Sequence, residues 1–184
     1  MKRQIHLTAW LMLAGVTPLL AQEFPNFPKP TKQHEFLKQF AGEWETNSES
    51  VMAEGQPAMK CQGKIQAKML GGFWVVLELE SDMMGMKINA LQTIGYDDTS
   101  KKYVGTWVDS MMNHLWKYEG TVDATGKILT LESEGPNFLE AGKTAKYRDV
   151  YEFKSKDLII TTSLAQDKDG EWITFMTGTA KRKK

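Results

Sequence analysis

A single cysteine, Cys61, is all that the 184-residue chain offers for covalent cross-linking, so no disulfide can form within it. Charge of either sign is not in excess, because 23 Lys and Arg residues balance 23 Asp and Glu residues. A chain without a basic surplus lacks the electrostatic signature of nucleic-acid binding, so we expect no nucleic-acid partner. Stability must therefore come from the packing of side chains alone.

Metal ligands are equally scarce. After residue 21 the chain keeps His34, His114 and Cys61 as its only histidine and cysteine side chains, which are too few for a zinc site. The methionines at 83–86 and 111–112 are unusual, and thioethers suit Cu(I). We interpret them instead as apolar hairpin tips that line a portal, and we expect neither a metal nor a cofactor.

Residues 1–21 have the pattern of a signal peptide. Lys2 and Arg3 form a positive head, residues 5–20 are mostly apolar, and Ala21 offers a cleavage point. An uncleaved membrane anchor is the alternative, and the polar residues within the apolar run argue against it. We therefore expect an exported protein, periplasmic or secreted, with no stable membrane span after cleavage.

Residues 22–30 form a proline-rich extended leader, because each proline keeps the residue before it out of the α region. Phe24 and Phe27 either pin this leader to the domain or belong to a flexible linker. The remaining residues, 31–184, suit a single domain with a sizeable core.

A short helix is predicted over residues 32–40, with Thr31 as its N-cap and Gly42 as its stop signal. Its apolar stripe consists of Phe36, Leu37 and Phe40. We expect His34, in the first turn, to be solvated or to cap the helix rather than to bind a ligand.

After Gly42 the hydrophobic period changes to two, which is typical of strands. Trp44 shares one face with small hydroxyl residues, while the opposite face is acidic and must lie outside. Turn sequences separate the strands and no long crossover helix is expected, which favours antiparallel pairing in sequence order. The predicted fold is all-β, a single antiparallel meander barrel of about ten strands with one short N-terminal helix. The expected strands cover residues 43–53, 59–69, 72–81, 86–97, 102–110, 113–122, 127–134, 145–154, 157–166 and 171–181.

Several short motifs resemble known families. The order of elements resembles the calycin plan of lipocalins and fatty-acid-binding proteins, in which a helix is followed by a glycine-x-tryptophan motif, here Gly42-Glu43-Trp44, and then by a meander of strands. In lipocalins the tryptophan closes one end of the barrel, often under a basic residue of the last strand, a role that this resemblance gives to Trp44 and to Lys181 or Arg182. Haem-binding members of the wider barrel group use a histidine on a late strand, and residues 145–184 contain none.

The order of motifs also resembles one family more closely, the bacterial domain-of-unknown-function family 1579. The resemblance covers about residues 31 to 182 and implies the barrel fold without any activity. The motifs that carry it are His34…Leu37…Gly42-Glu43-Trp44, Leu70-Gly71-Gly72-Phe73, Gly95-Tyr96-Asp97 and Tyr103…Trp107-Val108-Asp109-Ser110.

The hairpin at 103–118 is the most informative stretch for function. A turn at residues 111–112 places Trp107 opposite Trp116 and brings an Asp–His pair to the same inward face. An inward aromatic set with few polar anchors is typical of a ligand pocket, although the same rings could simply fill the core. The strand predicted at 145–154 adds one inward carboxylate, that of Asp149. The candidate ligand-binding residues are therefore Tyr103, Trp107, Asp109, His114, Trp116, Tyr118 and Asp149.

In this register Asp109 lies opposite His114. A carboxylate that orients an imidazole is part of a hydrolase constellation, and acid–base chemistry would need only the histidine. No nucleophile-elbow sequence accompanies the pair. We therefore favour a protein that binds a small hydrophobic or amphipathic ligand in the barrel interior. The alternatives are a structural or interaction module with a filled barrel and, third, an enzyme that uses this pair. An outer face with Ile173 and Phe175 would add a contact surface for a homodimer.

Overall fold

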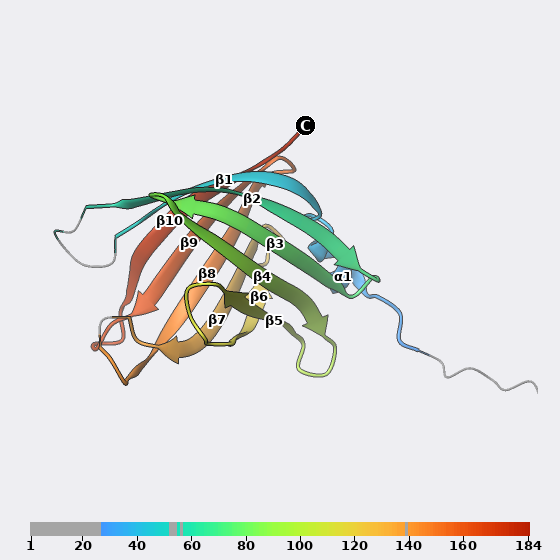
Figure 1. Cartoon of the computed structure of the whole chain (residues 1–184). Coiled ribbons are helices and arrows are strands. Elements are labelled where there is room, and N and C mark those ends of the chain that lie inside the picture. The colour runs from blue at the N-terminus through green and yellow to red at the C-terminus, as the bar shows by residue number, and fades with distance from the viewer. Residues whose placement is uncertain (1–26, 52–54, 56, 139) are drawn as a thin grey trace, which may run out of the picture.

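The computed structural model describes residues 27–51, 55, 57–138 and 140–184 (Figure 1). The expected signal peptide and the first part of the expected leader lie outside these residues. In the described part of the leader Phe27 is exposed and is not pinned to the domain. The elements are α1 (Lys32–Leu37), β1 (Gly42–Ser50), β2 (Met59–Leu70), β3 (Trp74–Met83), β4 (Met86–Asp97), β5 (Lys102–Asp109), β6 (Trp116–Val122), β7 (Ile128–Pro136), β8 (Thr144–Ser155), β9 (Leu158–Gln166) and β10 (Trp172–Arg182).

Each strand pairs antiparallel with its neighbours in sequence, and β1 also pairs with β10, so the sheet closes into a barrel. The prediction of an all-β antiparallel meander barrel of ten strands is therefore confirmed. Closure pairs the amides that an open sheet would leave at its edges. Within the described ranges, no helix is long and apolar enough to cross a bilayer.

All ten predicted strands are observed, and their ends lie within three residues of the predicted ones. Two ends differ by three residues: β1 ends at Ser50 rather than at residue 53, and β6, which the hydrophobic pattern predicts from residue 113, begins at Trp116. The Asp109 carboxylate accepts hydrogen bonds from the backbone amides of Met111 (2.7 Å) and Met112 (3.2 Å). These bonds hold the chain in a turn, and β6 therefore starts later.

α1 is shorter than the predicted helix at 32–40, because its last turn has i to i+3 hydrogen bonds. Thr31 is the N-cap, as predicted. His34 Nδ1 accepts a hydrogen bond from the Thr31 amide (3.0 Å) and lies 2.8 Å from its hydroxyl oxygen. His34 is therefore a capping residue, and it is buried against the rings of Phe73 and Tyr96 rather than solvated.

α1 packs against β3 and β4 at the end of the barrel where β2 leads into β3 (Figure 1). Trp44 is buried at this closed end and donates a hydrogen bond from Nε1 to the carbonyl of Phe40 (2.7 Å). The Arg182 guanidinium lies 4.0 Å from the centre of the Trp44 ring and donates to three backbone carbonyls. Arg182, rather than the exposed Lys181, thus takes the place that the calycin resemblance gives to a late basic residue.

The opposite end of the barrel, which we call the mouth, is where β1–β2, β3–β4, β5–β6, β7–β8 and β9–β10 are connected. Burial of the inward side chains changes along the barrel axis. Near the closed end they are buried, as at Phe40, Val75 and Ile94. Toward the mouth the inward side chains of β1, including Thr46 and Ser48, are only half-buried. The core therefore fills the closed end more tightly than the mouth.

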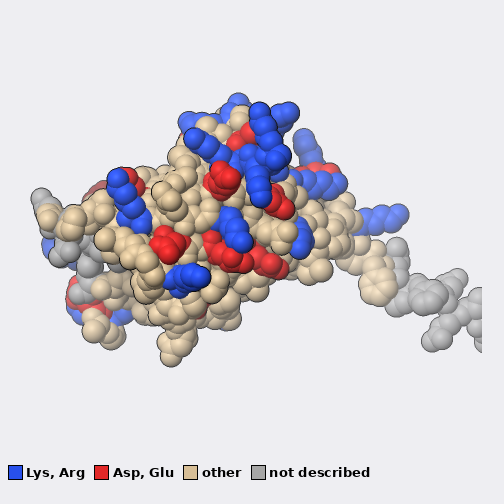
Figure 2. Space-filling view, turned by 45° about the horizontal axis from the view of Figure 1, so that its top comes forward, with Lys and Arg blue, Asp and Glu red and all other residues tan. Residues whose placement is uncertain are grey.

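The outer wall carries interleaved charges of both signs (Figure 2). On neighbouring strands Lys64 lies 3.0 Å from Glu80, and Lys60 lies 3.5 Å from Glu49. All four side chains are largely exposed, so each pair contributes little to stability. The wall is thus a solvated surface, and the distinctive chemistry of the fold lies inside.

β10 contains a β-bulge between Thr174 and Met176. The bulge shifts the alternation of side chains and lets Phe175 pack on the core, 6.2 Å from the Tyr147 ring centre. Ile173 stays exposed. An outer apolar face made of Ile173 and Phe175 together, which would have offered a dimer surface, therefore does not form, because Phe175 packs on the core.

Candidate ligand site inside the barrel

The inner face of the barrel keeps accessible surface toward the mouth. Trp107, Asp109, Asp149 and Tyr151 lie in register with buried inward residues yet are only half-buried. Because these side chains point inward, the surface that they expose faces the inside of the barrel. The opposite wall is built from small half-buried residues, which are Thr46, Ser48, Cys61, Gly63, Thr161 and Gly178. This interior is the candidate site.

The predicted pairing of the two tryptophans is confirmed, since Trp107 and Trp116 are register partners on β5 and β6. Trp107 Nε1 donates a hydrogen bond to Asp109 Oδ2 (2.8 Å), and Asp109 Oδ1 accepts the turn amides described above. Both carboxylate oxygens are thus engaged within the hairpin. Among the described contacts no hydrogen bond joins Asp109 to His114, and the pairing of β5 with β6 ends at Trp107 and Trp116, so the structure does not show the expected Asp–His pair.

Trp116 is the centre of an aromatic group near the mouth. Its ring lies edge-to-face with His114 (4.8 Å between centroids) and with Tyr147 (5.1 Å). Gly135, on the facing part of β7, makes this arrangement possible, because a Cβ there would lie 2.3 Å from the indole. His114 Nε2 is buried without a hydrogen-bond partner in the part of the chain that the structure describes. The group therefore offers an apolar wall with one unsatisfied ring nitrogen.

A partly buried hydrogen-bond network on the inner face connects β6, β8 and β9. Asp149 accepts hydrogen bonds from the Tyr118 hydroxyl (2.8 Å) and from the Ser163 hydroxyl (2.5 Å). Burial raises the pKa of the Asp149 carboxyl, while the two hydrogen bonds oppose that rise. Burial and the neighbouring carboxylate raise the pKa of Tyr118, so the phenol keeps its proton. Asp149 and Tyr118 lie together inside the barrel, as the alternation of the strands predicts.

A second polar contact crosses the interior from β8 to β4. The Tyr151 hydroxyl donates to Gln92 Oε1 (3.0 Å), and burial raises the pKa of this phenol. Gln92 is only 2% exposed, and its Nε2 has no hydrogen-bond partner among the described residues. Sequence reasoning missed Gln92, although its alternation with Ile88, Ala90 and Ile94 marks it as inward.

Tyr103 is the one candidate that the structure separates from the others. Its ring packs at the closed end against Phe36 and Tyr96, and its hydroxyl donates to the carbonyl of Gln33 (3.0 Å). Burial raises its pKa to about 12. Tyr103 thus fixes the segment around α1 to the barrel, while the other candidates lie nearer the mouth.

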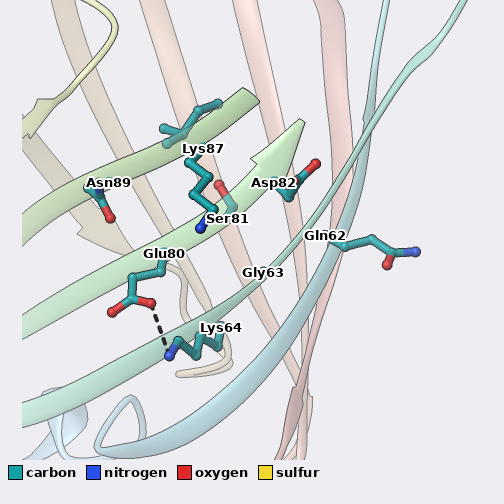
Figure 3. Close-up of a pocket in the computed structure, with 9 residues that line it drawn as sticks. Gln62, Gly63, Lys64, Glu80, Ser81, Asp82, Lys87 and Asn89 are labelled. Carbon is teal, nitrogen blue, oxygen red and sulfur yellow. Dashed lines mark ion pairs between the residues drawn. The ribbon is translucent and has the colours of Figure 1, made fainter. Parts of the chain in front are cut away.

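The outer wall has a groove of about 370 Å³ over β2, β3 and β4 (Figure 3). Its charged side chains include the Lys64–Glu80 ion pair, and apart from Gly63 and Ile88 the rest of its lining is polar. These groups are already paired or solvated, so the groove offers no buried anchor. Within the described residues no group of three His, Cys, Asp or Glu side chains could hold a metal ion.

The closed meander, the helix at one end and the partly open interior define a calycin-like β-barrel. The chain matches the family described as a protein of unknown function, DUF1579, over residues 29–182 and belongs to that family. The predicted resemblance to this family is therefore confirmed. The comparison with curated proteins finds no match.

Two solved structures share the architecture at low identity. The S-type phycobiliprotein lyase CPES from Guillardia theta is 13% identical with a TM-score of 0.56, covering 82% of this chain and 92% of that chain. Rv2717c from M. tuberculosis is 9% identical with a TM-score of 0.60, covering 85% and 100%. At these identities the likeness shows the fold alone.

Proposed function

We propose that the protein binds a small hydrophobic or amphipathic molecule inside the barrel. The observation that carries this proposal is the Gln92 carboxamide, whose buried Nε2 lacks a hydrogen-bond partner among the described residues. A buried donor left unsatisfied costs about 1–3 kcal/mol, so a ligand that brings an acceptor to this amide relieves that cost. Buried polar groups that lack a partner in a pocket commonly mark the anchor of its ligand.

The surroundings of Gln92 indicate the chemistry of that ligand. Trp107, the register partner of Gln92, presents a half-buried aromatic face, and the Trp116 group continues this apolar surface toward the mouth. The ligand would therefore have an apolar body of moderate size and one hydrogen-bond acceptor, a carbonyl or a carboxylate, at its inner end.

The substitution Gln92→Met tests this assignment because it keeps the side-chain volume and removes the amide. We expect the affinity for a fluorescent fatty acid, dansyl-undecanoic acid, to fall roughly tenfold, which corresponds to one hydrogen bond of about 1.4 kcal/mol. Leu91→Ser is the matched control, since Leu91 is the next residue on β4 and lies on the outer wall. We expect it to leave the affinity unchanged.

Two results would contradict the proposal. One is a wild-type protein that takes up no fatty-acid or aromatic probe and keeps a clean apo mass in native mass spectrometry, which would favour the filled module. The other is equal affinity in the wild type and the Gln92→Met variant, which would remove Gln92 as the anchor.

Export to the periplasm or the medium is the second part of the proposal. It is supported by the positive head and the apolar run of residues 1–21. Intact mass spectrometry of the protein from an exporting host should give a chain that begins at Gln22. A full-length mass in the cell pellet would contradict export.

A further inference from the structure

The mouth of the barrel is surrounded by exposed apolar side chains. Each of its five connections carries or borders at least one, and Met84, at the tip of the β3–β4 turn, is the most exposed at 77%. Exposed apolar residues that gather at one place on a protein mark an interaction site. We call this set the rim, and its members are Val51, Met84, Met111, Leu115, Phe138 and Ile173.

Of the four connections at the closed end, all within the described residues, only that between β2 and β3 has exposed large apolar side chains beside it. Asp97 accepts hydrogen bonds from the amides of its β4–β5 turn, and Asp123 does the same in the β6–β7 turn. Leu70 and Trp74 are the exposed apolar exceptions beside the β2–β3 turn, and Trp74 covers Gly95. The rim is therefore a property of the mouth and not of the turns in general.

The rim is continuous with the apolar interior. The Phe138 ring lies 5.2 Å from the ring of Tyr147 and 6.1 Å from that of Trp116. Next to the exposed Met111, Met112 packs on the core, so the same turn faces both solvent and interior. An apolar molecule could thus move from the rim to the Trp116 group without crossing a charged barrier.

We propose that the rim docks on the surface of a lipid bilayer and that the ligand passes through the mouth between bilayer and barrel. This inference rests on the proposed function, since it names the source of the bound molecule. Separate apolar tips suit insertion between lipid headgroups, where each tip buries its own surface. A mouth-to-mouth pair of chains would instead place two openings at the centre of its interface, where stable interfaces have a packed core.

The charges beside the rim are largely compensated. Lys143 forms an ion pair with Glu140 in the β7–β8 connection, and Lys168 lies 2.8 Å from Asp169 in the β9–β10 connection. Without an excess of cations, docking would depend on apolar insertion rather than on anionic lipids. Binding should therefore tolerate salt and should occur on uncharged vesicles.

A flotation experiment with vesicles of pure phosphatidylcholine tests the inference on the mature chain. The wild type should float with the vesicles. The triple variant Met84→Ser, Met111→Ser, Leu115→Ser should lose roughly tenfold or more of its partition coefficient, because three inserting side chains become polar. Raising NaCl to about 0.5 M should leave the wild-type partition unchanged, because that concentration screens surface charges.

The matched control removes the same number of exposed apolar side chains elsewhere. Its substitutions are Leu70→Ser at the closed end and Leu91→Ser and Val108→Ser on the outer wall, where Leu91 and Val108 are register partners. This variant should float like the wild type. Equal losses in the two variants would overturn the inference, as would a wild type that stays in solution or that detaches in high salt.

Two further measurements separate the possible failures. In vesicle-free buffer the rim variant should bind dansyl-undecanoic acid with the wild-type affinity, because none of its three substituted side chains belongs to the Trp116 group or contacts Gln92. A wild type that binds this probe but does not float would overturn the bilayer inference and leave the proposed function standing. Light scattering that shows a wild-type dimer and a monomeric rim variant would also overturn it, since the rim would then join two chains.

Discussion

Replacing Arg182 by alanine should destabilise the barrel without touching the proposed site. The guanidinium donates to the carbonyls of Lys156 (2.8 Å), Ala41 (2.6 Å) and Gln39 (2.9 Å), and it covers the Trp44 ring. Each bond from a charged donor contributes about 1.5 kcal/mol, and the ring contact adds about 0.5 kcal/mol. The side chain is a quarter exposed, so water replaces part of this loss. We expect the free energy of unfolding to fall by about 3 kcal/mol.

Urea unfolding followed by tryptophan fluorescence measures this change. The free energy of unfolding of Arg182→Lys should fall by about half as much, because a lysine keeps the charge but its single ammonium group cannot donate to three carbonyls as the planar guanidinium does. Lys181→Ala is the control at the neighbouring exposed position and should change the free energy by less than about 0.5 kcal/mol. A loss below about 1 kcal/mol for Arg182→Ala, or one no larger than that of the control, would refute the idea that this side chain holds the closed end.

Two further predictions concern the interior. Burial raises the pKa of Asp149 above its ordinary value of 3.8, so the folded protein keeps a proton that the unfolded chain has lost, and stability should fall as the pH rises above about 4. In the Asp149→Asn variant the unfolding temperature should change less with pH between pH 4 and 8 than in the wild type. An equal change in both proteins would mean that another group causes the pH dependence of stability. Gly135→Ala should cost about 2 kcal/mol because the new methyl group meets the Trp116 indole. That cost should shrink when Trp116→Phe makes room, and strict additivity of the two changes in urea unfolding would contradict the contact.

Most of the architecture could be predicted because strands leave a strong local signal. The period-two alternation around Trp44 and the turn sequences between strands place the ten strands and the inward face of β1. The tryptophan pair of β5 and β6 follows from a symmetric hairpin. The predicted start of β6 is too early because Asp109 binds turn amides. The alternation does not assign the two faces of β10, where a bulge interrupts it.

The candidate site was less accessible to sequence reasoning. The contact between Tyr151 and Gln92 joins residues 59 positions apart on strands that are not neighbours, and no local pattern specifies it. The sequence signal for Gln92 is a glutamine in line with apolar inward residues. This pattern predicts that the side chain is buried but does not identify its hydrogen-bond partner. His34 shows the same limit, because its capping role is local while its burial against Phe73 and Tyr96 depends on the closed barrel.

The pairing of β1 with β10 also determines when the fold can be completed. The contact of Arg182 with Ala41 spans 141 residues, and the seam between the first and last strands cannot form until the whole chain is available. Loop-closure entropy makes such non-local pairing slow compared with local hairpins. Until the seam closes, β1 and β10 each expose an unpaired edge that another chain could join. A chain that lost residues 172–184 would keep nine strands and remain an open sheet with two such edges.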